Sequence, residues 1–256
     1  MRTLLYLFKS QDKQAKPLLY FGFSQFALAL LFVMLLPFEH RQVLGINLWI
    51  KPLKFAVSIG IYCISWAKIL PYLSNTKTKK YFIWFTIFAM AFEMLAISSQ
   101  AARGQLSHFN QSGTYNIVVY ALMGIVITAQ TCFALYVGIS FFKNQNIKIE
   151  VAMLWAIRFG IVISSVFALQ GGFIGQRMAH TVGAPDGGPG LLFFNWNTTY
   201  GDLRIAHFFG LHALQILPAF VWLGKLRRPA PVIIFGAIYF ILVSFLFYHA
   251  LLAKGY

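Results

Sequence analysis

Apolar residues run along the chain in seven stretches, each long enough to cross a membrane as a helix. The stretches cover residues 17–38, 49–71, 81–102, 115–142, 151–176, 204–224 and 231–253. About 20 helical residues cross the roughly 30 Å hydrocarbon layer of a bilayer. The pattern predicts an all-α fold: a polytopic membrane protein with seven transmembrane helices in one bundle, forming a single domain over residues 1–256.

The connections between these stretches are short, with one exception. Residues 177–203 form a long loop rich in glycine and proline, a composition that favours tight turns over helix. Such a loop can fold back over a cavity in the bundle, or dock a protein partner. An ordinary structured connector has the same composition.

The composition disfavours a soluble protein. Only 11% of the residues are charged, against about a quarter in globular sequences. The formal net charge of +15 suggests nucleic-acid binding until the basic residues are located, because they lie between the apolar stretches. We therefore expect contact with a lipid bilayer and no nucleic-acid partner.

Lysine and arginine are divided unequally between the two faces, which predicts the orientation because cytoplasmic loops are enriched in both. The face that carries the N-terminus holds 13 of the 21 basic residues and the opposite face holds 7. The larger set is Arg2, Lys9, Lys13, Lys16, Lys68, Lys77, Lys79, Lys80, Lys143, Lys148, Lys225, Arg227 and Arg228. We predict a multi-pass protein of the inner (plasma) membrane with a cytoplasmic N-terminus and an outside C-terminus.

Polar residues concentrate near the predicted outer face, where all six histidines lie. Ionisable groups inside hydrocarbon are costly and commonly mark function. We predict an outward-facing, periplasmic-facing cavity in which Glu93, His207 and Asp202 act as catalytic groups. The predicted metal ligands are His212, His249, His40, His108 and His180, and the predicted cofactor-binding cations are Lys51, Lys54, Arg103 and Arg204.

These residue types suit either of two cofactors. Imidazole and carboxylate ligate metal ions, whereas paired imidazoles with basic partners for propionates suit haem. The favoured interpretation is a metal- or haem-binding membrane enzyme that acts on a lipid or small lipophilic substrate. The alternatives are a transporter or proton- or ion-translocating protein, and a subunit, assembly factor or sensor that docks a protein partner through the 177–203 loop. A second copy of the chain is also among the partners that we consider. A buried structural ion pair between Glu93 and Lys54 is the non-functional explanation of those two residues.

Overall fold

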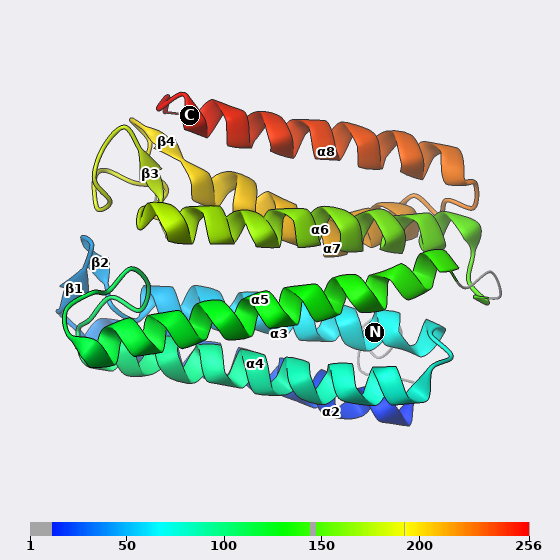
Figure 1. The fold of residues 1–256 in the computed structure, drawn as a ribbon, viewed down its shortest axis with the longest axis horizontal. Helices are drawn as coiled ribbons and strands as arrows, with labels where there is room; N and C mark the ends of the chain where they lie inside the picture. The colour runs from blue at the N-terminus through cyan, green and yellow to red at the C-terminus, as the bar shows by residue number, and fades with distance from the viewer. Residues whose placement is uncertain (1–11, 144–146, 192, 256) are drawn as a thin grey trace. The chain divides into compact units, whose positions relative to one another are not determined.

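A computed structural model describes residues 12–143, 147–191 and 193–255, and within these ranges it contains seven helices long and apolar enough to cross a membrane (Figure 1). They are α2 (Lys16–Leu35), α3 (Ile50–Ile69), α4 (Thr76–Ala102), α5 (Thr114–Lys143), α6 (Val151–Arg177), α7 (Leu203–Leu223) and α8 (Pro229–Leu251). The predicted spans are confirmed, and the largest shift is at α4, which begins at Thr76 where the prediction began at residue 81. The chain is thus a multi-pass integral membrane protein in contact with lipid, and its orientation stays a prediction.

Short elements link the helices. They are the 3-10 turns η1 (Lys13–Ala15), η2 (Leu36–Phe38) and η3 (Leu70–Tyr72), and the strands β1 (Gln42–Val43), β2 (Ile46–Asn47), β3 (Thr181–Val182) and β4 (Gly201–Asp202). Each strand pair is antiparallel: Val43 faces Ile46, and Thr181 faces Asp202. The β3–β4 pair closes the two ends of the long loop onto each other.

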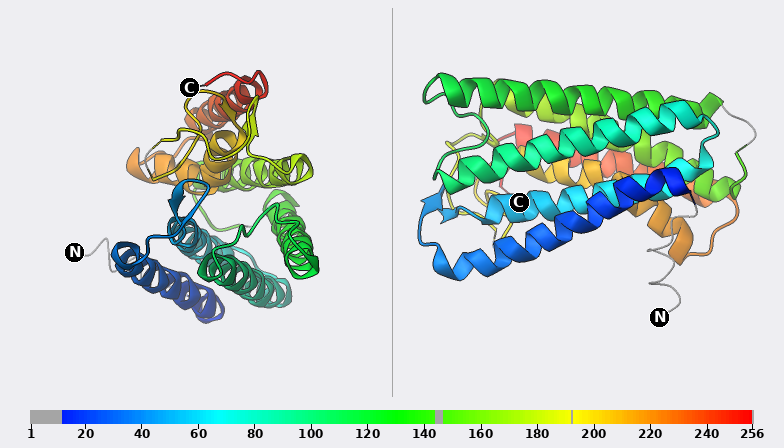
Figure 2. Two further views of the ribbon diagram at one scale, coloured as in Figure 1. Left: turned by 90° about the vertical axis from the view of Figure 1, so that its left-hand side faces the viewer. Right: turned by 90° about the horizontal axis from the view of Figure 1, so that it is seen from below.

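The chain divides into two compact units, residues 1–130 and 131–256. In the first unit, α2 packs on α3 (Figure 2). Their backbones come close at two glycines, because a Cβ on Gly22 would lie 3.1 Å from the carbonyl oxygen of Gly60. Small residues allow such close approach between membrane helices. The prediction of a single domain stays a prediction.

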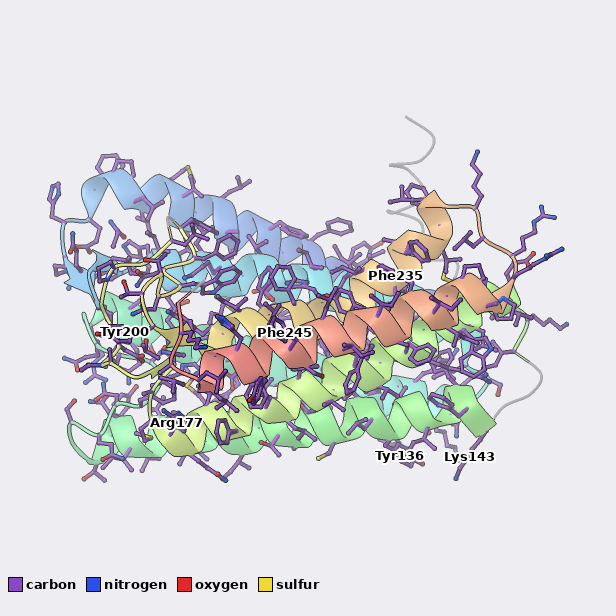
Figure 3. The ribbon with its side chains drawn as sticks, turned by 90° about the horizontal axis from the view of Figure 1, so that it is seen from above. Tyr136, Lys143, Arg177, Tyr200, Phe235 and Phe245 are labelled. Carbon is purple, nitrogen blue, oxygen red and sulfur yellow. The ribbon has the colours of Figure 1, made fainter. Side chains whose placement is uncertain are left out.

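In the second unit, α6, α7 and α8 pack against one another. The α6–α7 contact is close because Gly210 lies against Phe167 and a Cβ on Gly160 would be 3.1 Å from the Ala213 carbonyl oxygen. At the loop end of this unit, Gly201 of β4 lies against the backbone of Ala250 in α8. Figure 3 shows Arg177 and Tyr200 at this end, with Phe245 and then Phe235 further along α8.

Candidate functional site

The loop between α6 and α7 is organised around the carboxylate of Asp186. Both carboxylate oxygens accept the backbone N–H of His180 at 3.0 Å, and Oδ1 also accepts the N–H of Thr181 at 2.8 Å. Oδ2 lies 2.7 Å from Nδ1 of His180. A carboxylate accepts hydrogen bonds, so Nδ1 of His180 is the donor and the Nε2 edge of the ring is directed away from Asp186.

Asp186 lies outside the membrane-spanning helices, and its charge state follows from these contacts. Burial alone would raise its pKa, but the hydrogen bonds from the His180 side chain and from the backbone of His180 and Thr181 hold the pKa of Asp186 well below its usual range. The carboxylate is therefore ionised at neutral pH. An ionised partner at Nδ1 orients the ring and raises the basicity of its other nitrogen.

His207 is held in a related way by α6. Its Nδ1 lies 2.7 Å from the carbonyl oxygen of Phe167. A carbonyl can only accept, so Nδ1 carries a proton, and in the neutral form of the ring the lone pair is at Nε2. No described residue hydrogen-bonds that nitrogen. The ring lies over Gly171, where a Cβ would be only 2.9 Å from its Cε1 atom.

The loop brings His180 to the helix that carries His207. The N–H of Leu203 donates to the His180 carbonyl oxygen at 3.1 Å, which places His180 beside the first turn of α7. His207 follows one turn later, about 6 Å along the axis at 1.5 Å per residue. The second unit thus gathers two histidines whose Nδ1 atoms are both occupied as donors.

Asp202 and Arg204 fasten the other end of the loop. Asp202 is fully buried, caps α7 by accepting the N–H of Arg204 at 2.9 Å, and accepts the N–H of Asn197 at 2.7 Å. The Arg204 guanidinium pairs with Asp202 at 2.5 Å and donates to the Asn195 carbonyl. These contacts give both residues a structural role in holding the loop on α7.

Aromatic side chains of the loop and α7 form a cluster that reaches His212 through Phe208. Phe194 stacks on Trp196 with ring centroids 4.4 Å apart, and Trp196 meets Phe208 edge-on at 5.4 Å. Phe208 in turn contacts the His212 ring at 4.4 Å. His249 belongs to α8, where its ring lies 6.0 Å from Phe245. The apolar wall formed by Phe194, Trp196 and Phe208 is suited to a lipophilic group.

The remaining predicted site residues belong to the first unit. Nζ of Lys51 lies 3.4 Å from Nδ1 of His108, and Arg103 donates to Gln100 at 3.1 Å. Glu93 is 5% exposed, and its Oε1 atom has no hydrogen-bond partner among the described residues. Lys54 is partly buried in α3, and His40 is exposed after η2.

The predicted cavity combines Glu93, which belongs to the first unit, with His212 and His249, which both belong to the second. That combination stays a prediction. Among the residues that the structure describes, no group of three or more His, Cys, Asp and Glu side chains lies together as a metal-binding cluster. The structure instead brings His180 and His207 together in one unit, with Asp186 behind the first and a backbone carbonyl behind the second.

No protein-family model matches the sequence, and no curated protein or solved structure matches it. We therefore infer the function from the geometry of these residues.

Several residues around these groups were not predicted as site residues. Asp186 and Gly171 position His180 and His207, and in the first unit Thr86, Asn116 and Gln130 contribute buried polar side chains. Thr86 could have been identified from the sequence, because Thr86, Glu93 and Gln100 are spaced seven residues apart. The partner of His207 is a backbone carbonyl, for which the sequence has no signal.

Proposed function

We propose that this membrane protein binds a transition metal, as an ion or as haem iron, through the Nε2 atoms of His207 and His180. The observation that carries the proposal is the hydrogen bond from Nδ1 of His207 to the Phe167 carbonyl, which leaves the Nε2 lone pair available inside the unit. Metal-ligating histidines almost always donate their other ring N–H to a carbonyl or carboxylate. His180 has the carboxylate version of that arrangement, with Asp186 as acceptor.

Two imidazole ligands are consistent with haem iron and also with a metal ion bound directly by the protein. Haem iron takes one or two axial imidazoles, and a catalytic ion keeps open positions for water or substrate. The aromatic wall of Phe194, Trp196 and Phe208 beside His212 supports a lipid or small lipophilic molecule as the substrate. We accordingly propose a redox or hydrolytic membrane enzyme, located in the inner (plasma) membrane with this loop outside.

The test is a binding titration of the full chain, purified in detergent with a tag that lacks histidine and stripped of metal. Co²⁺ reports imidazole coordination by its visible absorption, and haemin reports it by its Soret band. His207→Asn is the informative variant, because the asparagine amide nitrogen can replace the Nδ1 donor to Phe167 while the ligand nitrogen is lost. We expect this variant to lose at least tenfold in affinity for one of the two probes.

Glu150→Gln is the control, because Glu150 is an exposed side chain at the start of α6. It should bind the probe as the unchanged protein does. If His207→Asn binds both Co²⁺ and haemin as tightly as Glu150→Gln, His207 is not a ligand and the proposal is wrong.

A further inference from the structure

A buried polar row crosses the first unit between α4 and α5. On α4, Thr86, Glu93 and Gln100 are spaced seven residues apart and are 0%, 5% and 0% exposed. Residues seven apart share one helical face, two turns from each other. All three polar side chains therefore point to the same side of α4, within a helix that is otherwise apolar enough to cross a membrane.

On α5, Asn116, Met123 and Gln130 have the same spacing and are 4%, 2% and 1% exposed. Gln100 donates to Asn116 at 2.8 Å, and Gln130 donates to Thr86 at 2.8 Å. These two hydrogen bonds fix the register of the antiparallel helices. In that register, the residue opposite Glu93 is Met123.

Glu93 is thus the middle member of the row, and its neighbour on α5 cannot satisfy it. The side chains packed around Met123 are apolar: Ala96, Ile97, Phe55, Phe92 and Val119. A buried carboxyl oxygen without a hydrogen-bond partner costs free energy, and such groups persist in membrane spans mainly where they serve a function.

Basic and titratable groups approach this carboxyl from one end of the unit. Lys51, in the first turn of α3, interacts electrostatically with Glu93, and its Nζ lies 3.4 Å from Nδ1 of His108 in the 103–113 loop. Among the described residues, further charged or titratable groups along the row include Arg103 beside Gln100, Tyr120 beside His108, and Tyr62, whose hydroxyl accepts from Gln130 at 3.3 Å.

We propose that Glu93 is a proton-exchange site, which takes up and releases a proton through His108 and Lys51 at the 103–113 loop end. In this step a hydronium ion in the water at that end loses one O–H bond and becomes water, and a carboxylate oxygen of Glu93 forms one O–H bond. The proton returns to water by the same route, so no oxidant or co-reactant is required. The site lies in the first unit and does not depend on metal binding by His207.

The experiment is a pH jump on the full chain in lipid nanodiscs, followed by infrared difference spectroscopy of carboxyl groups. The chain has only six acidic residues, so a carboxyl band can be assigned by single substitutions. We expect a protonation band that disappears in Glu93→Gln and persists in the exposed control Glu150→Gln. An identical set of bands in both variants would overturn the proposal.

The route is tested by two lysines of the same helix. Lys51→Met should slow the appearance of the Glu93 band by about tenfold or more, because it removes the polar link to His108. Lys68→Met makes the same charge change at the opposite end of α3 and should leave the rate unchanged. Equal rates in the two variants would show that the proton does not arrive by way of Lys51.

A chemical measurement covers the case in which Glu93→Gln does not fold. Dicyclohexylcarbodiimide partitions into membranes and adds to protonated carboxyl groups. Trypsin cleavage after Lys80 and Arg103 releases a peptide whose only acidic residue is Glu93. We expect an adduct on this peptide that increases as the pH falls, and a peptide without adduct at every pH would contradict the proposal.

Discussion

Removing the charge of Asp202 should release the long loop from α7. The Asp202 carboxylate accepts hydrogen bonds from the backbone of Asn197 and from the backbone and guanidinium of Arg204. Asp202→Asn keeps the size of the side chain but places an amide N–H₂ group, which is a donor, next to these donors. The substitution leaves the Arg204 guanidinium without its anionic partner. It also leaves one acceptor oxygen for two backbone N–H groups, because in the carboxylate Arg204 donates to Oδ1 and Asn197 donates to Oδ2.

The magnitude follows from the burial of the two partners. Breaking a buried ion pair by removing one charge costs about 3–5 kcal/mol. Asp202 is fully buried, but the Arg204 side chain is 26% exposed, so water compensates part of the loss. We expect a loss of roughly 2–4 kcal/mol, and about 1 kcal/mol lowers Tm by roughly 2–4 °C in a chain of this size. The expected decrease in Tm is thus of order 5–15 °C.

The assay combines thermal unfolding in nanodiscs with hydrogen exchange at two amides. The N–H of Asn197 donates to Oδ2 of Asp202 and the N–H of Arg204 donates to Oδ1, so at least one of these amides should exchange faster in Asp202→Asn, which has a single acceptor oxygen. Glu150→Gln, an exposed change of the same kind, should alter neither Tm nor these amides. A Tm within about 1 °C of the unchanged protein, with both amides still protected, would refute the role assigned to Asp202.

Three further predictions concern the surroundings of His207, the long loop and the topology. Gly171→Ala places a Cβ 2.9 Å from Cε1 of His207 and should weaken metal or haem affinity by about 10–100-fold in a titration, whereas the neighbouring Gly172→Ala has open space and should not. The pKa of Asp186 is lowered in the folded protein, so the contribution of its charge to loop stability is present above about pH 4 and is lost as the pH falls through the folded pKa. The fluorescence of Trp196 should change in that transition, and Asp186→Asn should abolish the change. A periplasmic-type reporter fused after residue 256 should be active and a cytoplasmic reporter silent; the reverse result would invert the predicted orientation.

The membrane helices were predictable because their signal is local. Each apolar run reports a span directly, and the ends shift where a capping residue extends the helix into polar sequence. At α4, the Asn75 side chain accepts the N–H of Thr78 at 3.0 Å, so the helix begins within a stretch of threonine and lysine that hydropathy alone assigns to a loop.

The arrangement of the site residues was only partly predictable, because it depends on partners distant in the sequence. The pairing of β3 with β4 places His180 beside α7, and the sequence between them gives no indication of that register. His207 was assigned a catalytic role and His180 a metal-binding role, and the structure brings both imidazoles to one end of the same unit. The carbonyl of Phe167, which sets the tautomer of His207, is a backbone group present at every position.

The polar row between α4 and α5 was predictable in part from the sequence. The shared face of Glu93 and Gln100 follows from helical periodicity, whereas its match to α5 requires the relative register of the two helices. The hydrogen bond between Gln100 and Asn116 supplies that register. A polar residue seven positions from Glu93 was therefore recognisable in the sequence, but the absence of a partner opposite Glu93 was not.

The most direct test of the central claim is the cofactor content of the protein as it is purified from its membrane. Elemental analysis and absorption spectra of the full chain should show a transition metal or haem at close to one equivalent. His207→Asn, prepared identically, should retain its helical fold and contain less than a tenth of that amount. Equal metal and haem content in the two preparations, or none in the unchanged protein, would contradict the assignment of His207 as a ligand.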